Sequence, residues 1–413
     1  MPKVLMIAFH FPPYQGGSGV HRTLKFSRYL PEFGWDPIIL TATPNAYPAT
    51  GEDQLAEIPQ GVLVKRAFAL DTSRHLSIRG IYPNFLAMPD RWTSWWFAGV
   101  AAGLRLIRKY RPKCIWSTYP IPTAHLIGLT LHKITGLPWV VDFRDTMTEE
   151  NYPTDPATWQ VYRWIERRAV AACSFAVFTA PGALGMYAQR YPGISDNRWK
   201  MIPNGYDEED FKDMDSVTRG VSLSHTVTLV HSGVLYTSER NPDAFFAAVS
   251  SLRRARRLSP GDLKVVLRGC GDDDRYRRKV ADLNIQDIVF IEKAIPYRDA
   301  LREMMTSDGL LVFQAGNCNQ QIPAKIFEYF RAQKPILTLT DPDGDTAALV
   351  RAEGVQSIVR LDSVDEIQDG LMKFVAQVQK GSASIPSLQT VAKYSRQQGA
   401  KELGRLLGAL SQA

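Results

Sequence analysis

Cysteine is scarce in this sequence. Its 413 residues include four, Cys114, Cys173, Cys270 and Cys318, which lie far apart and form no C-x-x-C pair. This scarcity excludes a zinc ribbon, a dithiol redox motif and a disulfide framework, and it indicates a reducing compartment.

Long hydrophobic runs are also missing. The apolar N-terminal segment stops at Pro12 and Pro13, too early for the hydrophobic region of a secretory signal. The best internal run, at 97–104, ends at Arg105 and falls well short of the ~20 residues that cross a bilayer. The sequence therefore predicts a cytoplasmic protein whose contact with a membrane is at most peripheral.

Metal-binding patterns are absent as well. No H-E-x-x-H occurs, and the seven histidines have no ligand spacing. The acidic segment at 341–345 is followed by Thr346 and Ala352 where a calcium-binding EF-hand loop needs Gly and Glu. We expect no metal ion and no other bound cofactor.

Acidic residues are clearly outnumbered by basic residues only in the first half of the chain. The net charge is +7, with 22 Lys and Arg against 14 Asp and Glu in residues 1–205, and 27 against 28 in residues 206–413. A basic half suits nucleic acid, an anionic membrane surface or a phosphorylated small molecule. The basic runs at 105–113 and 253–257 lie in helical patterns, and the first is followed by a strand-like segment without a platform of basic and aromatic residues, which disfavours nucleic acid.

What the sequence does have is an alternation of short apolar segments and longer amphipathic ones, typical of parallel strands joined by helices. Strands are predicted at 3–9, 36–42, 114–118, 138–143, 174–180 and 200–204, and then at 226–233, 263–269, 288–292, 309–313, 335–339 and 357–361. The pattern predicts two doubly wound α/β domains, at 1–205 and 226–390. A linker at 206–225 separates them, and a C-terminal helical segment at 391–413 can pack back on the first domain.

A glycine-rich loop follows the first predicted strand. The segment FPPYQGGSGVHR at 11–22 places Gly16 and Gly17 just before a helix, where free backbone amides bind anions. Arg22 stands where a dinucleotide-binding fingerprint needs its third glycine. A plain flexible connection explains the two glycines equally well.

Three charged residues follow the strand predicted at 138–143. Asp142, Arg144 and Asp145 lie at its carboxyl end, the edge where open α/β sheets bind ligands. Burying three charges is costly unless they are paired or used, so we favour a functional role. An Arg–Asp ion pair that fixes the loop is the structural alternative.

The second half contains the richest candidate segment, QAGNCNQQIPAKIFEYFRAQKPIL at 314–337. Lys325 and Glu328 are three residues apart and therefore share one face of a helix that begins near Pro323. A glycine loop at 231–242 precedes them in the same domain, and its Arg240 can reach an anion held by that helix. The alternatives are a surface ion pair and a solvated arginine.

Taken in order, these elements resemble the family-4 glycosyltransferases of the GT-B fold. Seven elements match in the correct sequence: FPPYQGGSGVHR, DFRD, IPNGYD, HSGVLYTSERNP, VLRGCG, IPAKIFEYFRAQKPIL and KYSRQQGAKEL. The resemblance implies two Rossmann-like domains that face each other across a cleft. It also implies a retaining enzyme that uses a nucleotide-sugar donor, commonly in the synthesis of surface polysaccharides and glycolipids.

The resemblance also implies roles for individual residues. Arg240 and Lys325 would hold the diphosphate of the donor, and Glu328 its ribose. The other residues implied on the donor side are Gly16, Gly17, Gly233, Gln320, Gln321 and Ile322, and those on the acceptor side, or with a structural role, are Asp142 and Asn204.

The sequence departs from the family pattern at three places. Gln320 replaces the first glutamate of the E-x7-E element, and Val234 replaces an arginine after the glycine of its loop. Arg144 and Asp145 stand where many relatives have a histidine, which makes Asp145 a candidate base.

The sequence thus predicts transfer of a sugar, from a UDP-linked donor in our leading hypothesis, to a saccharide or lipid-linked acceptor. The basic first half would meet the acceptor and an anionic membrane at its inner face. Two alternatives stay open: a nucleotide-sugar 2-epimerase and a non-catalytic sugar-nucleotide-binding protein.

Overall fold

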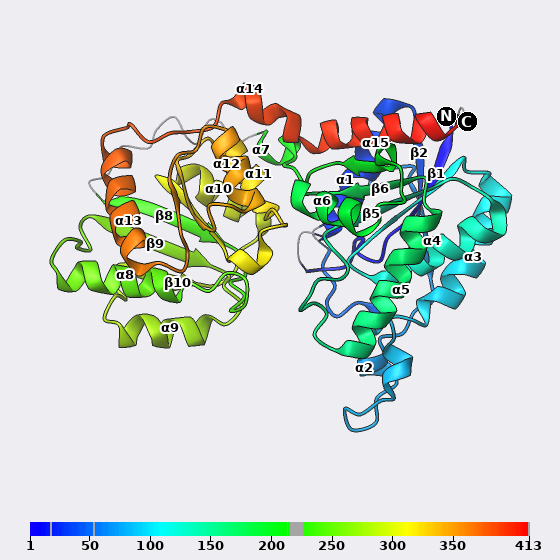
Figure 1. Cartoon of the computed structure of the whole chain (residues 1–413), viewed down its shortest axis with the longest axis horizontal. Coiled ribbons are helices and arrows are strands. Elements are labelled where there is room, and N and C mark those ends of the chain that lie inside the picture. The colour runs from blue at the N-terminus through cyan, green and yellow to red at the C-terminus, as the bar shows by residue number, and fades with distance from the viewer. Residues whose placement is uncertain (17–18, 53, 213, 215–225, 412–413) are drawn as a thin grey trace. The chain divides into compact units, whose positions relative to one another are not determined.

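The computed structural model describes residues 1–16, 19–52, 54–212, 214 and 226–411. The chain divides into two compact units, one formed by Met1–Asn204 with Arg396–Ala413 and the other by Gly205–Ser395 (Figure 1). Gly17 and most of the expected linker at 206–225 lie outside the described residues. Each unit is an α/β layer structure built on a parallel sheet, as predicted.

Unit 1 contains a seven-stranded parallel sheet with the order β3-β2-β1-β4-β5-β6-β7. Its strands are β1 (Lys3–Ile7), β2 (Asp36–Ala42), β3 (Leu63–Ala67), β4 (Cys114–Thr118), β5 (Trp139–Arg144), β6 (Phe175–Phe178) and β7 (Trp199–Met201). Its α-helices are α1 (Gly19–Tyr29), α2 (Thr72–His75), α3 (Trp95–Tyr110), α4 (Pro122–Thr135), α5 (Pro156–Ala172), α6 (Pro181–Arg190) and α15 (Arg396–Ser411).

Unit 2 contains a six-stranded parallel sheet with the order β10-β9-β8-β11-β12-β13. Its strands are β8 (Val227–Ser232), β9 (Leu263–Arg268), β10 (Val289–Glu292), β11 (Gly309–Gln314), β12 (Ile336–Thr340) and β13 (Ile358–Val359). Its α-helices are α7 (Glu208–Phe211), α8 (Asp243–Arg254), α9 (Asp273–Asp282), α10 (Tyr297–Thr306), α11 (Lys325–Ala332), α12 (Asp345–Ala352), α13 (Val364–Gln379) and α14 (Leu388–Val391).

Every predicted strand is present, and one strand, β3, was missed. The predicted strands are short apolar runs because both faces of a parallel sheet are covered by helices. Strand β3 lies at the sheet edge and pairs only with β2, and Lys65 and Arg66 interrupt its apolar pattern. A half-exposed edge strand therefore lacks the signal that identified the others.

The C-terminal helix α15 belongs to unit 1 rather than to the unit that precedes it in the chain. Leu403, Leu406 and Leu407 are fully buried and pack in one cluster with Leu24 and Trp35. Helix α15 thus completes the core of unit 1 beside α1.

All four cysteines are buried, and none of them forms a disulfide bond. In the part of the chain that the structure describes, no helix combines the length and the apolar character that spanning a membrane requires.

Candidate functional site

The strand order of each sheet identifies one edge position for a ligand. In unit 2 the connections run from β8 outwards to β10 on one side and from β11 to β13 on the other. The loops after β8 and β11 consequently leave the sheet in opposite directions at its carboxyl edge, the position at which open α/β sheets bind ligands. In unit 1 the corresponding position lies between β1 and β4.

Lys325 lies at this position of unit 2, as the first residue of α11. Its Nζ is 3.1 Å from Nε2 of His231, the penultimate residue of β8. Nδ1 of His231 lies 2.9 Å from the carbonyl of Leu311, to which it can only donate, so Nε2 is the acceptor for Lys325. His231 therefore orients the lysine, a role that the sequence analysis missed.

Gly233 leaves the room that Lys325 occupies. Its φ is +122°, and a Cβ at this position would lie 2.9 Å from the Nζ of Lys325. A side chain on residue 233 would be strained and would displace the ammonium group, so the glycine is needed for both backbone and packing.

The cluster around Lys325 carries positive charge. Burial and the neighbouring Arg240 lower the pKa of Lys325 to about 7. Burial and Lys325 hold the pKa of His231 well below its usual value, so this imidazole stays neutral. Glu328 acts in the opposite direction and raises the pKa of Lys325, but burial and Arg240 outweigh it. Two cationic groups held this close together favour the binding of an anion.

Arg240 has spare hydrogen-bonding capacity. Its guanidinium lies 5.6 Å from the ring centre of Tyr236, and its Nε is buried without a hydrogen-bond partner among the described residues. A phosphate oxygen would satisfy such a donor.

The remaining donor-side residues that belong to unit 2 lie on α11 or in the loop before it, whereas Gly16 lies in unit 1. Glu328, one turn after Lys325 on α11, accepts a hydrogen bond of 2.9 Å from the hydroxyl of Tyr297. Gln320 lies in the loop after β11, and its Oε1 is buried with no described partner. Gln321 follows it, with its carbonyl bonded by Thr346, and Ile322 is buried. A carboxylate and an unsatisfied amide beside a cationic pair can bind hydroxyl groups next to a diphosphate.

In unit 1, Asp142 is held in a buried ion pair. Arg22 on α1 binds it through two hydrogen bonds of 2.7 and 2.9 Å, and both side chains are almost completely buried. Arg22 also donates to the carbonyls of Ile202 and Pro203, which directly precede the buried Asn204. Asp142 therefore joins α1, β5 and the end of unit 1, and this geometry supports its structural assignment.

The Arg–Asp ion pair that the sequence analysis gave as the structural alternative is thus present for Asp142, but its arginine is Arg22 of α1 rather than Arg144 of the same loop. Arg22 lies four residues before the buried Phe26, and therefore on the apolar face of α1. An arginine at such a position is the sequence signal that could have revealed a buried partner for Arg22.

Arg144 has an unusual backbone conformation at the end of β5. Its φ is +61°, in the left-handed region, and the chain bulges there relative to β6. Its NH1 donates to the carbonyl of Tyr119 at 3.2 Å, while its Nε is buried without a described partner. Asp145 is half-buried and accepts a hydrogen bond of 3.4 Å from Thr179. A strained residue at a ligand-binding edge is typical of a functional site.

The loop after β1 approaches Arg144 from the other side. His10 stacks on Tyr14 with 4.3 Å between ring centres, and burial together with Arg144 lowers its pKa to about 3. A Cβ on Gly19 would lie 2.6 Å from Nδ1 of His10, so this glycine lets α1 begin against the histidine. Gly16 is exposed with a φ of +145°.

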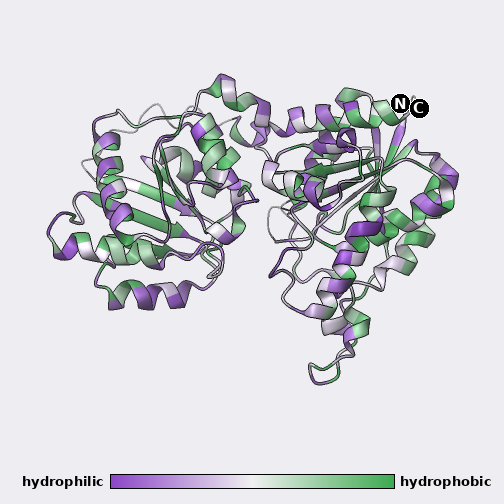
Figure 2. Cartoon of the chain, in the orientation of Figure 1, coloured by the Kyte–Doolittle hydropathy of each residue, from purple (hydrophilic) through white to green (hydrophobic). Residues whose placement is uncertain are grey.

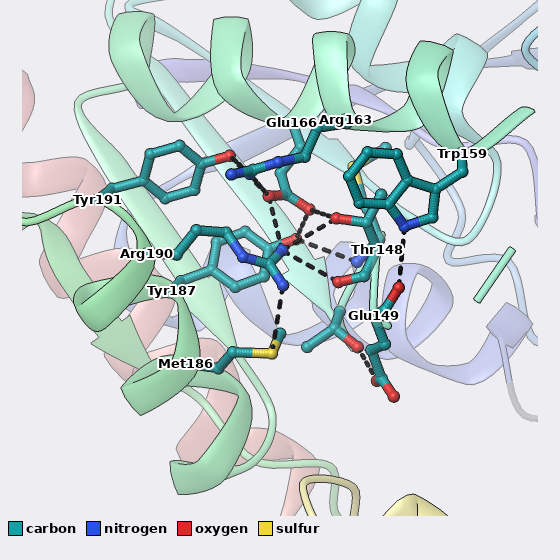
Figure 3. Close-up of polar contacts among 11 residues, drawn as sticks. Thr148, Glu149, Trp159, Arg163, Glu166, Met186, Tyr187, Arg190 and Tyr191 are labelled. Atoms are coloured by element: carbon teal, nitrogen blue, oxygen red, sulfur yellow. Dashed lines mark hydrogen bonds and ion pairs between the residues drawn. The ribbon is translucent and has the colours of Figure 1, made fainter. Parts of the chain in front are cut away.

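A buried carboxylate fixes the segment that follows Arg144 and Asp145 (Figure 3). Glu166 on α5 is fully buried and accepts hydrogen bonds from five groups, which belong to Thr148, Arg163, Tyr187, Arg190 and Tyr191. Tyr187 also accepts the backbone N–H of Met147 at 3.0 Å. This network holds the loop after β5 against α5 and α6.

A cavity of about 490 Å³ lies at the carboxyl edge of unit 1, next to the loop after β4. Its lining combines aromatic rings with carboxylates, namely those of Tyr82, Trp92, Tyr162, Asp90 and Asp155. Asp90 accepts the backbone N–H groups of Trp92 and Thr123, and burial raises its pKa. Such a mixture of ring faces and acceptors suits a polar molecule with apolar faces, such as a sugar.

The described residues include no group of three or more His, Cys, Asp or Glu side chains arranged to hold a metal ion.

Comparison with known proteins finds a domain family that matches part of unit 1 and a fold that the whole chain shares with solved structures. The family profile of the glycosyl transferase 4-like domain matches residues 16–205. No curated protein matches the chain in sequence.

Several solved structures share the architecture. Anabaena Alr3699/HepE in complex with UDP-glucose is 13% identical, with a TM-score of 0.65 over 98% of this chain and 99% of that one. Sucrose-phosphate synthase from Thermosynechococcus elongatus is 13% identical, with a TM-score of 0.63 over 100% and 97%. The UDP-forming α,α-trehalose-phosphate synthase from Burkholderia xenovorans in complex with glucose-6-phosphate is 12% identical, with a TM-score of 0.64 over 98% and 100%. At these identities the likeness shows the fold.

Proposed function

We propose that this chain, a glycosyltransferase with the GT-B fold whose residues 16–205 form a glycosyl transferase 4-like domain, transfers a sugar from a UDP-sugar to a saccharide acceptor. The observation that carries the proposal is the cationic cluster of Lys325 and Arg240 at the carboxyl edge of the unit 2 sheet. The Anabaena protein of the same fold was crystallised with UDP-glucose, which supports a UDP-linked donor.

The donor diphosphate would lie against Arg240 and Lys325. Transfer breaks the bond between the sugar and the diphosphate, so negative charge grows on the departing phosphate oxygen. A buried ammonium and a guanidinium positioned in advance stabilise that charge most strongly where water is excluded. Glu328 would bind the ribose hydroxyls, and the free amide oxygen of Gln320 would bind a hydroxyl of the transferred sugar.

The acceptor would bind to unit 1. The cavity lined by Tyr82, Trp92 and Tyr162 offers ring faces and acceptors for a saccharide, whether free or linked to a lipid. Asp145 would accept the proton of the attacking hydroxyl. The Burkholderia enzyme of the same fold was crystallised with glucose-6-phosphate, which supports a saccharide acceptor.

The finer features of the proposal rest on the family resemblance. We propose transfer with retention, without a metal ion, in the synthesis of a surface polysaccharide or glycoconjugate at the inner face of an anionic membrane. The excess of Lys and Arg in residues 1–205 supports this placement.

Calorimetric titration with UDP tests the donor site. Glu328→Ala should weaken UDP binding by at least about tenfold, since a hydrogen bond to a charged group contributes about 1.5–3 kcal/mol and about 1.4 kcal/mol corresponds to a factor of ten. The matched control is Glu366→Ala, an exposed glutamate on α13 of the same unit, which should bind UDP like the wild type. Equal UDP affinity in the wild type and Glu328→Ala would remove the ribose role.

Turnover with UDP-sugars tests the reaction. Transfer should depend on an added saccharide acceptor and should release UDP. Release of an epimerised sugar without any acceptor would instead support an epimerase, and tight donor binding without turnover would support a binding protein.

A further inference from the structure

A projecting hairpin in unit 1 displays an unusual amount of hydrophobic surface. The three most exposed large hydrophobic side chains in the described part of the chain are Ile78, Ile81 and Phe85, with exposed fractions of 80%, 78% and 73%. All three lie in the segment Leu76–Phe85, which we call the apolar hairpin. It extends beyond α2 and away from the sheet of unit 1, and hydrophobic residues are visible along it (Figure 2). Side chains of this kind are normally buried, so this surface needs an explanation.

The apolar hairpin is a defined structure. Ile78 and Ile81 exchange two backbone hydrogen bonds of 2.9 and 3.0 Å. Between them Arg79 and Gly80 both have positive φ, at +53° and +80°, which closes a tight two-residue turn. The turn thus presents both isoleucines at its tip.

The base of the hairpin is fixed to the body of unit 1. The hydroxyl of Thr72 donates to the carbonyls of Leu86 and Arg91, so the two ends of the segment are held together. Arg91 also binds the buried Asp71 at 2.8 Å. Because these contacts anchor its base, the hairpin has a fixed position on unit 1.

The charges of the hairpin and of α2, which precedes it, have one sign. Arg74 on α2 and Arg79 in the hairpin are both exposed, and no Asp or Glu occurs between Thr72 and Pro89. One nitrogen of the Arg74 guanidinium donates to the carbonyl of Tyr47, which holds this side chain beside the hairpin. Asp71 and Asp90, which flank the segment, are buried. Exposed isoleucine and phenylalanine side chains together with arginines form a combination that suits the boundary between acyl chains and anionic headgroups.

We propose that the apolar hairpin inserts into the surface of an anionic lipid bilayer, with Ile78, Ile81 and Phe85 among the acyl chains and Arg74 and Arg79 at lipid phosphates. A bilayer accommodates a narrow hydrophobic tip without a complementary pocket, whereas a protein partner needs a matching groove. The basic balance of residues 1–205 acts in the same direction, because it attracts the whole unit to an anionic surface.

Insertion would also bring the acceptor cavity to the membrane. Tyr82 and Asn84 line the cavity, and they alternate along the chain with the exposed Ile81 and Phe85. On the proposed function, on which this step rests, the acceptor is therefore a saccharide held at the membrane by a lipid.

Vesicle flotation of the full chain, without any sugar nucleotide, tests the insertion. The probes are vesicles of phosphatidylcholine and vesicles in which about a third of the lipid is phosphatidylglycerol. We expect the wild type to bind the anionic vesicles and to bind them less at high salt. The triple variant Ile78→Asn/Ile81→Asn/Phe85→Asn should bind at least about tenfold more weakly, because it loses the buried apolar area. Arg74→Gln/Arg79→Gln should bind anionic vesicles more weakly.

The matched control is Ile134→Asn, which alters an exposed isoleucine on α4 of the same unit, 58% exposed. It should bind vesicles like the wild type, and thermal unfolding should confirm that the triple variant is folded. Absence of wild-type binding at low salt overturns the proposal, as does a triple variant that binds like the wild type. An equal loss in Ile134→Asn also overturns it, since the membrane contact then lies elsewhere. Failure of UDP binding or transfer leaves this result unaffected, so the two proposals fail separately.

Discussion

The protonation state of Lys325 depends on the charged groups that lie beside it. In the free protein, burial and Arg240 hold its pKa near 7, so a large fraction is neutral at physiological pH. A bound diphosphate brings negative charge to the ammonium group and raises this pKa again. Binding of UDP is therefore coupled to uptake of a proton.

The sign of this linkage gives a pH prediction for UDP affinity. Below pH 7 Lys325 is protonated in both states, and its contribution to affinity is constant. Above pH 7 the free lysine loses its proton before the bound one does, so affinity falls as the pH rises. Calorimetry in buffers of different ionisation enthalpy should show proton uptake near pH 8. Lys325→Met should abolish the uptake, and uptake that survives this change would show that another group titrates.

Gly233 is predicted to resist even the smallest substitution. Gly233→Ala forces a side chain into a φ of +122° and against the Nζ of Lys325, so it should cost about 1–3 kcal/mol of unfolding free energy and weaken UDP binding. Gly185→Ala is the control, because that glycine lies in α6 with open space around its Cβ position. Urea unfolding should show the control to be neutral or stabilised by up to about 1 kcal/mol. Equal effects of the two changes would contradict the steric argument.

At the scale of the element, the loop after β5 depends on Glu166. Glu166→Gln keeps the shape of the side chain but replaces one acceptor oxygen with a donor, which cannot accept from the groups that face it. Breaking this buried pairing with Arg163 and Arg190 should lower the unfolding free energy by about 3 kcal/mol in urea denaturation. Glu150→Gln, an exposed change on the same loop, should stay within about 0.5 kcal/mol of the wild type. A Glu166 variant as stable as this control would show that the network contributes little.

Elements with a strong local pattern were predictable from sequence, and the pairings between them were not. The central parallel strands are apolar on both faces, so short apolar runs predicted them. The edge strand β3 contains Lys65 and Arg66 and was therefore missed. The spacing of Lys325 and Glu328 placed both on one helical face.

The site residues that sequence analysis missed act across long separations. His231 meets Lys325 from 94 positions away, and Arg22 meets Asp142 from 120 positions away. His231 and Arg22 are polar residues among apolar neighbours in the sequence. Such a position indicates that the side chain has a buried partner, but it does not indicate which residue the partner is. Only the strand order brings such pairs together.

At the scale of the whole molecule, unit 1 is assembled from both ends of the chain. Its core includes α15, which the chain reaches only after completing unit 2. Folding of unit 1 therefore requires a contact between residues nearly four hundred positions apart, such as Leu403 and Leu24. A chain that ends before α15 would expose the apolar cluster between α1 and the sheet.

Point substitutions in α15 test this dependence without truncation. Leu403→Ala and Leu407→Ala each remove a fully buried side chain, and each should lower the unfolding free energy by about 2–5 kcal/mol. The control is Leu388→Ala on α14, where the leucine is 49% exposed and the change should cost less than about 1 kcal/mol. Calorimetric unfolding should show the transition of unit 1 moving to lower temperature, while UDP, which we place on unit 2, still raises the other transition. If the α15 variants instead lowered only the transition that UDP stabilises, then either α15 would support the donor unit or UDP would bind unit 1.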